Sequence, residues 1–238
     1  MYNFIKRFFD IFFISLGILI LSPFFVIIIL ILRFTSEGEV FYNQSRIGLN
    51  KNKFKIFKFA TMRKNSIFIG HKSHTVRNDP RITKVGKILR ITKINELPQL
   101  FNVLNGTMSL VGPRPLIESS FNKYPDELKN IIYLNKPGIT GLGSLIFRDE
   151  EKLVSIYDDL GGETLYYYRN YIFPFKAKVE NWYYHNKTFF VDFIILFLTF
   201  YSILFKKNTF IFKIFKTIPT IPEMLTEKGI QNYSNEKK

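Results

Sequence analysis

The sequence predicts a mainly helical α+β fold, in which a re-entrant membrane helix hairpin precedes a small globular domain with a short sheet. Three observations carry this prediction: an uncharged apolar run over Ile11–Leu32, a strongly basic stretch after it, and two β-rich segments around a glycine-containing loop. With 238 residues, of which 47% are apolar, the chain can bury a sizeable core. Disorder is therefore excluded as its main state.

The apolar run near the N-terminus is long enough to cross a membrane. Its 22 residues would span about 33 Å as a helix. Ser22-Pro23 lies at its middle, where a proline removes a helix hydrogen bond and kinks the backbone. Basic residues flank both ends of the run, which favours a hairpin over residues 1–35 with both ends in the cytoplasm. A single kinked span is the alternative.

The segment that follows, residues 36–188, is predicted to be a soluble domain between the two apolar runs of the chain. Glu39–Asn43 and Lys53–Phe59 are rich in β-branched and aromatic residues on either side of Gly48–Asn52, which predicts a strand pair around a loop. The remainder of this domain is poor in glycine, and we expect it to be mostly helical.

A second apolar run, Phe189–Phe205, ends at a pair of lysines. Its 17 residues make a marginal membrane span, so we predict an interfacial or membrane-associated helix over residues 189–207. A buried core helix fits the same pattern. The segment 208–238 is rich in Thr, Pro, Glu and Asn and is predicted to be a mobile tail.

The charge of the chain is unevenly distributed. Lys and Arg total 34 against 19 Asp and Glu, a net charge of +15, and Asn43–Asn95 holds 14 of the basic residues with Asp79 as its one acid. Such an excess indicates an anionic partner: nucleic acid, a phosphorylated metabolite or an acidic membrane surface. The absence of cysteine excludes disulfides, thiolate zinc sites and a cysteine nucleophile.

The stretch Ile94–Gly106 is predicted to be an amphipathic helix that ends at Gly106. Its apolar residues recur with helical spacing, at Leu97, Leu100, Phe101 and Leu104. Asn95 is then expected to be the N-cap, with Glu96 beside the positive end of the helix dipole. Such an end can bind phosphate, although Asn95 and Glu96 could equally cap a core helix.

Met108–Pro115 is predicted to be a short apolar strand that runs into Gly-Pro-Arg-Pro. The two prolines fix the backbone on either side of Arg114. A guanidinium held in this way suits bidentate binding of phosphate. An exposed arginine in an ordinary turn is the alternative.

Eight motifs occur in an order that resembles the bacterial sugar transferase family, the monotopic polyprenyl-phosphate glycosyl-1-phosphate transferases. The resemblance covers roughly Tyr2 to Phe205. The motifs are Lys6-Arg7-x-x-Asp10, Ser22-Pro23, Arg46-Ile-Gly48, Lys58-Phe-Ala-Thr-Met62, Asp79-Pro-Arg81, Asn95-Glu-Leu-Pro-Gln99, Met108–Pro115 and Lys136-Pro-Gly-Ile-Thr-Gly141.

The resemblance implies an enzyme at the cytoplasmic face of the bacterial inner membrane, held there by a re-entrant helix broken at Ser22-Pro23. Such enzymes transfer a sugar-1-phosphate from a UDP-sugar to undecaprenyl phosphate and release UMP, with Mg²⁺ as cofactor. This is the first membrane step of capsule, O-antigen or exopolysaccharide synthesis. By motif match, Glu96 is the dyad glutamate and metal ligand, Arg90 and Arg114 bind phosphate, and Lys58 lies near the same pocket.

Two residues depart from the family pattern. Asn95 stands where the family has its nucleophilic aspartate, and Ala60 stands where an arginine is common. An amide carries no negative charge and is a poor nucleophile. Three outcomes follow: Glu96 is the nucleophile or metal ligand, the polyprenyl phosphate attacks directly, or the protein is catalytically weak.

Two other classes of function compete with the enzyme. A weak or inactive member would be a membrane scaffold in polysaccharide assembly, and Asn95 is the main support for it. A nucleic-acid partner is not expected, because aromatic residues alternate with basic ones only over Phe54–Phe59. A homo-oligomer is compatible with the sequence, which does not set the oligomeric state.

Overall fold

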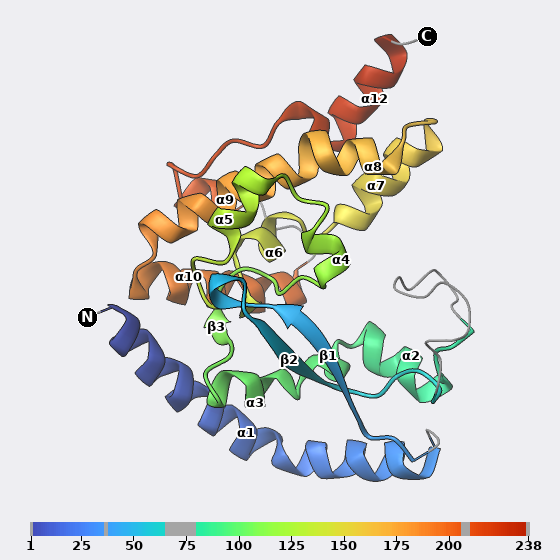
Figure 1. The fold of residues 1–238 in the computed structure, drawn as a ribbon, viewed down its shortest axis with the longest axis vertical. Helices are drawn as coiled ribbons and strands as arrows, with labels where there is room; N and C mark the ends of the chain where they lie inside the picture. The colour runs from blue at the N-terminus through green and yellow to red at the C-terminus, as the bar shows by residue number, and fades with distance from the viewer. Residues whose placement is uncertain (1, 36–37, 65–79, 206–209, 237–238) are drawn as a thin grey trace. The chain divides into compact units, whose positions relative to one another are not determined.

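The computed structural model describes residues 2–35, 38–64, 80–205 and 210–236. The chain forms two compact units, each described here by itself. Unit 1 comprises Met1–Lys6, Arg46–Lys53 and Ser109–Lys238, and unit 2 comprises Arg7–Ser45 and Phe54–Met108. The fold is mostly helical, as the sequence predicts, and it contains two small sheets where one was predicted (Figure 1).

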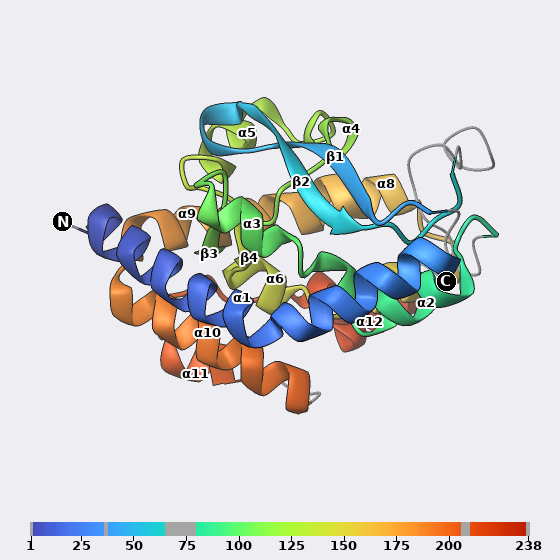
Figure 2. The same ribbon diagram turned by 90° about the horizontal axis from the view of Figure 1, so that it is seen from below.

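The first helix, α1 (Tyr2–Thr35), begins in unit 1 and continues through unit 2. It bends part-way along its length (Figures 1 and 2). Pro23 lies inside it and has no N–H for the carbonyl of Leu19, and the Ser22 hydroxyl donates to that carbonyl instead, at 2.8 Å. The predicted hairpin is therefore one continuous bent helix in the structure, rather than two helices joined by a turn.

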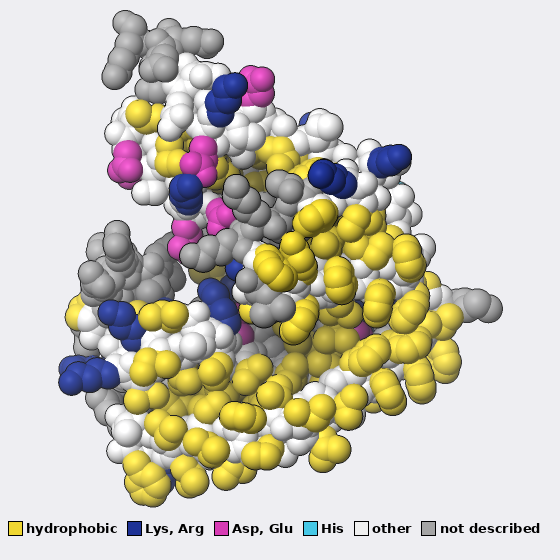
Figure 3. Space-filling view, turned by 180° about the vertical axis from the view of Figure 1, so that it is seen from behind, with side chains coloured by type: hydrophobic (Ala, Val, Ile, Leu, Met, Phe, Trp, Pro, Cys, Tyr) yellow, Lys and Arg dark blue, Asp and Glu magenta, His cyan; other side chains and the backbone are white. Residues whose placement is uncertain are grey.

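α1 is also long and apolar enough to cross a membrane by length and composition, and only 11% of its most apolar window is buried. Figure 3 shows apolar side chains gathered along this helix, at the bottom of the view. The exposed ones in its second half include Leu19, Ile20, Phe24, Ile27 and Leu30. This composition supports association with a membrane.

Besides most of α1, unit 2 contains most of two strands and two short helices. β1 (Phe41–Ile47) pairs with β2 (Lys53–Phe59), and both strands continue into unit 1 through the short helix η1 (Leu49–Lys51). The second strand has its predicted bounds, whereas the first lies nearer the loop than predicted. The chain then forms α2 (Lys84–Ile91), the 3₁₀ turn η3 (Ile94–Glu96) and α3 (Gln99–Leu104). The core of unit 2 consists of Phe25, Leu32, Phe59 and Leu89.

The parallel pair of strands in unit 1 was not predicted in full. β3 (Ser109–Val111) is the predicted strand, and it pairs with β4 (Gly138–Thr140), with Ser109 opposite Gly138 and Val111 opposite Thr140. The helices of this unit surround a core that includes Tyr133, Tyr167 and Ile172. They are α4 (Glu118–Phe121), α5 (Asp126–Ile132), α6 (Leu142–Ile146), α7 (Glu150–Asp159), α8 (Thr164–Tyr167), the π-helix η4 (Tyr168–Ile172), α9 (Phe173–Asn186), α10 (Phe189–Leu204), α11 (Phe210–Ile214), η5 (Glu223–Leu225) and α12 (Glu227–Glu236).

The second apolar run forms α10, which has two different apolar faces. Ile195 and Leu198 lie in the core of unit 1, whereas Phe190, Phe197 and Phe200 are exposed (Figure 3). The helix is therefore a core helix on one side. Its exposed phenylalanines are compatible with the predicted contact with a membrane interface, which stays a prediction.

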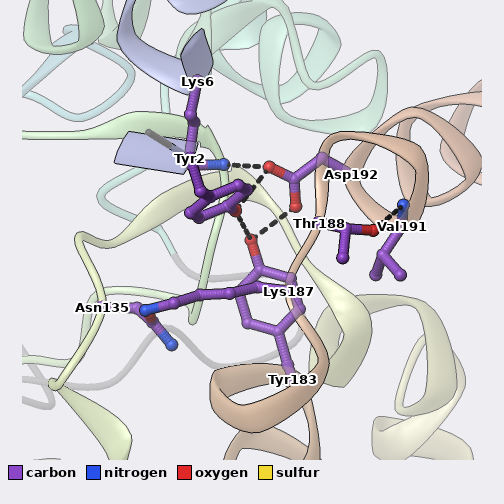
Figure 4. Close-up of polar contacts among 8 residues, drawn as sticks. All are labelled: Tyr2, Lys6, Asn135, Tyr183, Lys187, Thr188, Val191 and Asp192. Atoms are coloured by element: carbon purple, nitrogen blue, oxygen red, sulfur yellow. Dashed lines mark hydrogen bonds and ion pairs between the residues drawn. The ribbon is translucent and has the colours of Figure 1, made fainter. Parts of the chain in front are cut away.

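The first turn of α1 is tied to the first turn of α10 within unit 1. Asp192 accepts hydrogen bonds from the Lys6 ammonium and from the hydroxyls of Tyr2 and Tyr183, at 2.5, 2.9 and 2.6 Å (Figure 4). Both oxygens of this buried carboxylate therefore have hydrogen-bond partners. This cluster fixes the start of the apolar helix to the globular core.

The prediction of a mobile tail is wrong for the residues that the structure describes there. α11, η5 and α12 occupy much of the segment 210–236, and Ile211, Ile218, Leu225 and Ile230 are buried in the core of unit 1. This segment is mostly polar, and its few apolar residues are too widely spaced in the sequence to predict an ordered structure. Those residues bury enough surface to order the chain between them.

Candidate active site

The end of strand β2 carries the central ion pair of unit 2. The Lys58 ammonium lies 3.0 Å from Oε1 of Glu96, which ends the 3₁₀ turn η3. Both side chains are largely buried, with 15% and 24% of their surfaces exposed. A charged pair this sheltered from water interacts more strongly than one on the open surface. The structure thus brings together two of the predicted site residues.

Asn95 precedes Glu96 and is not the helix cap that we predicted. α3 begins only at Gln99 with Pro98 at its N-cap position, and Asn95 lies inside η3. The left-handed Lys93 (φ 61°) ends α2 and starts this tight turn, which moves the first α-helical residue further along the chain. Gly106 has a φ of 81° just after α3, which confirms the predicted helix end.

The side chain of Asn95 is buried with one oxygen unused. Oδ1 has no hydrogen-bond partner among the described residues, and the residue is only 9% exposed. A buried acceptor without a partner costs about 1–3 kcal/mol, so such atoms are rare in folded proteins. This oxygen is therefore an unused acceptor on the residue that precedes the ion-paired Glu96.

Arg90 is held by the segment that follows Lys58. Its Nε donates to Oγ1 of Thr61 at 2.8 Å, and Thr61 is buried. The helix that carries Arg90 approaches this segment closely, because a Cβ on Gly86 would lie 2.1 Å from the Thr61 carbonyl oxygen. Lys58–Thr61 therefore contacts Glu96 through its first residue and Arg90 through its last. Three of the predicted charged residues converge on one segment.

The predicted phosphate-binding Arg114 belongs to unit 1, where the backbone of its loop is rigidly held. A Cβ on Gly112 would lie 2.1 Å from the Lys136 carbonyl oxygen, and one on Gly138 would lie 2.1 Å from the Gly112 nitrogen. These two segments, which lie far apart in sequence, therefore pack backbone against backbone. This explains why both motifs need glycine at these positions.

Tyr133 holds the same loop from the other side. Its hydroxyl donates to the Arg114 carbonyl at 3.2 Å and accepts from the Leu116 N–H at 2.8 Å. Burial raises the pKa of Tyr133 well above its usual value, so the hydroxyl keeps its proton. Arg46 adds a hydrogen bond to the Pro115 carbonyl. The side chain of Arg114 projects to the surface from this fixed backbone.

Ala60, one of the two departures from the family pattern, is buried, and its N–H donates to the Val40 carbonyl. Asp79 lies outside the described residues. Two residues that contact these segments were not found from the sequence: Asn102, which bonds to the backbone of Phe57 and Lys55, and Tyr133. Asn102 interrupts an apolar pattern at a fully buried position, and that interruption was the signal available for it.

The oxygen atoms near η3 fit Mg²⁺ in kind. Mg²⁺ is bound by one or two protein carboxylates together with substrate phosphates, and carbonyl oxygens are acceptable ligands. Glu96 offers a carboxylate and Asn95 offers an unused carbonyl oxygen. Among the described residues no three His, Cys, Asp or Glu side chains gather into a metal cluster.

A comparison with known families decides the class of this protein. The family model of the bacterial sugar transferases matches residues 1–206. The chain belongs to this family. The match covers every motif described above, in both compact units of the transferase.

Curated relatives of this sugar transferase differ in length. The exopolysaccharide production protein ExoY of Rhizobium meliloti is 32% identical, with 86% of this chain and 88% of ExoY covered. The undecaprenyl-phosphate galactose phosphotransferase of Salmonella typhimurium is 34% identical over 83% of this chain, but only 40% of its own length is covered. The UDP-glucose:undecaprenyl-phosphate glucose-1-phosphate transferase of Klebsiella pneumoniae is 40% identical over 59% of this chain and 30% of its own length.

Proposed function

We propose that this sugar transferase moves a sugar-1-phosphate from a UDP-sugar to undecaprenyl phosphate. The family match over residues 1–206 carries the proposal. Relatives from Salmonella typhimurium and Klebsiella pneumoniae are named for transfers of this type, and the ExoY relative supports a place in exopolysaccharide production. By the same reasoning the reaction is the first membrane step of a polysaccharide pathway.

The reaction exchanges one phosphoanhydride bond for another. An oxygen of the undecaprenyl phosphate forms a bond to the sugar-bearing phosphorus of the donor, directly or after an enzyme carboxylate has done so. The bond from that phosphorus to the UMP oxygen breaks, and UMP leaves with the electron pair. Phosphoryl transfer of this kind depends on alignment and on positive charge around the phosphates. Lys58, Arg90 and Arg114 are the side chains that we propose for this role.

In this proposal Glu96 supplies the carboxylate that the reaction needs, as nucleophile or as metal ligand. Asn95 has no charge to form an acyl phosphate, whereas the Glu96 carboxylate is held in place by Lys58. Two routes use Glu96: it attacks the donor itself, or it binds the metal while the polyprenyl phosphate attacks directly. Both routes retain activity without an aspartate at residue 95.

We propose Mg²⁺ as the cofactor, bound by the Glu96 carboxylate and Oδ1 of Asn95 together with the donor diphosphate. Bound there, it would neutralise part of the charge that develops on the leaving UMP. The unused oxygen of Asn95 supports this assignment because it leaves one ligand position without a competing hydrogen bond.

The cytoplasmic face of the inner membrane is the proposed location, since UDP-sugars are cytosolic and the acceptor is a lipid. Both ends of α1 are then expected in the cytoplasm. An Asn3→Cys variant tests this expectation, because the chain has no native cysteine. We expect a membrane-impermeant thiol reagent to label residue 3 only after the inner membrane is opened. Labelling from the periplasm in intact spheroplasts would contradict the proposed topology.

A transfer assay tests the proposed function. Purified protein is incubated with undecaprenyl phosphate, Mg²⁺ and a panel of UDP-sugars that includes UDP-galactose and UDP-glucose. We expect UMP and a lipid-linked sugar to appear in equal amounts with at least one donor. Glu96→Gln is expected to lower turnover by about 10³-fold or more. A parent protein that releases no UMP with any donor would support the scaffold instead.

A further inference from the structure

Asn102 makes an unusual pair of contacts with strand β2. It is fully buried on α3, its Oδ1 accepts from the Phe57 N–H at 2.8 Å, and its Nδ2 donates to the Lys55 carbonyl at 2.7 Å. One side-chain amide thus satisfies an edge donor and an edge acceptor of the strand, as a neighbouring strand would. The amide docks α3 on β2 in a single register.

We propose that Asn102 is a positioning residue that aligns Lys58 with Glu96. This inference rests on the proposed function, in which these two side chains act on the donor. Phe57, which Asn102 binds, directly precedes Lys58 in β2. Glu96 lies only three residues before the first residue of α3. Any slip of α3 along β2 would therefore separate the two charged groups.

The far end of α3 is also fixed, so the docking cannot relax by tilting the helix. The Asn102 carbonyl accepts from the Met108 N–H at 3.0 Å. The Arg7 guanidinium donates to the carbonyls of Val103 and Leu104, at 2.5 and 2.6 Å, which are among the last acceptors of the helix. α3 is thus held by α1 at one end and by β2 along its side.

The same helix offers a matched control. Asn105 is the C-cap of α3, three residues after Asn102, and its side chain bonds only to Thr107 among the described residues. Asn105→Ala removes an amide from the same element without touching β2. Asn102→Asp keeps the acceptor for Phe57 and loses the donor for Lys55, so it removes half of the docking contact.

The first readout is the kinetics of transfer, with UDP-galactose or UDP-glucose as donor, whichever the parent turns over. We expect Asn102→Ala to lower kcat by about ten- to a hundredfold with little change in donor KM, since misplacement of reacting groups acts mainly on kcat. Asn102→Asp is expected to lower kcat at least as much, because its second oxygen would face the Lys55 carbonyl at a fully buried position. Asn105→Ala is expected to stay near the parent. An Asn102→Ala variant with parental kcat would overturn the proposal.

The second readout does not need activity, and it separates this proposal from the proposed function. The ammonium of Lys58, paired with Glu96, should react slowly with acetic anhydride compared with the exposed Lys123, as measured by peptide mass spectrometry. We expect Asn102→Ala and Asn102→Asp to raise the rate at Lys58 severalfold and Asn105→Ala to leave it unchanged. Equal rates in all variants would exclude a positioning role, even if the transfer reaction is confirmed. If the Asn102 variants react faster at Lys58 but the parent has no transferase activity, the positioning role of Asn102 stands and the proposed function is rejected.

Discussion

The two compact units hold their predicted phosphate-binding residues by different means. In unit 2, Lys58 and Arg90 are placed by contacts of their side chains, with Glu96 and Thr61. In unit 1, the loop of Arg114 is placed by its backbone, through close approaches at glycines and the Tyr133 hydroxyl. Side-chain pairs can exchange partners when a charged substrate binds, whereas packed backbones cannot. The comparison therefore separates a site held by side-chain contacts in unit 2 from a loop held by its backbone in unit 1.

The largest expected effect is on the backbone contacts of unit 1. In Gly112→Ala the new methyl group would lie 2.1 Å from the Lys136 carbonyl oxygen, a backbone atom that cannot move alone. We expect a loss of stability of about 3 kcal/mol or more, measured by chemical denaturation in detergent. Gly17→Ala is the control, because a Cβ there meets no described atom within 4 Å. If both variants unfold like the parent, the loop of unit 1 is not held by its backbone.

The second prediction compares two glutamates. Glu96 is paired and partly exposed, whereas Glu180 is buried on α9 with one oxygen that has no partner among the described residues. Burial raises the pKa of Glu180 to about 7, against the smaller opposing effects of Lys176 and the Gly143 N–H. The neutral form is therefore the one that the fold favours.

Because the pKa of Glu180 is higher in the folded state than in the unfolded chain, its stabilising contribution is full below about pH 4.5 and is lost as the pH rises through 7. The total loss is roughly 3 kcal/mol. We expect Glu180→Gln to unfold at higher denaturant than the parent at pH 8 and at a similar concentration at pH 5. Glu118→Gln, on an exposed ion pair with Lys53, should show no such difference. A parallel pH dependence in the parent and Glu180→Gln would contradict this assignment.

The smallest predicted effect concerns Arg114 itself. Arg114→Lys keeps the charge on the loop of unit 1 but loses the planar fork that binds a phosphate in a bidentate manner. We expect kcat/KM for the donor to fall about tenfold with an unchanged unfolding midpoint. Arg169→Lys, on an exposed residue of η4, should leave both quantities unchanged. Parental kinetics in Arg114→Lys would remove this side chain from donor binding.

Local pattern predicted part of this molecule correctly. Strand Lys53–Phe59, the start of β3 and the stop at Gly106 follow from residues that are neighbours in the sequence. The helix cap at Asn95 was wrong because the left-handed Lys93 sets the turn, and a left-handed lysine has no sequence signature. β4 was missed because its partner lies about thirty residues earlier in the chain. Contacts between distant segments leave little trace in a single sequence.

The resemblance predicted the candidate site as a set of residues but not their arrangement. The resemblance named Lys58, Arg90 and Glu96, and the structure brings all three to one segment of unit 2. The unused oxygen of Asn95 and the docking role of Asn102 depend on burial. Burial at these positions is decided by tertiary packing, which the local pattern does not contain.

The most direct test of the central claim is peptide mass spectrometry of the protein after incubation with the donor alone, beside a turnover assay with undecaprenyl phosphate. Asn95 stands where the family has its nucleophilic aspartate. The claim is that Glu96 supplies the carboxylate that the reaction needs in its place. In the parent we expect either a phosphosugar adduct on Glu96 or turnover without any adduct. Asn95→Asp should raise turnover and move the adduct to residue 95. Full activity of Glu96→Gln, with no adduct on either residue, would contradict the claim.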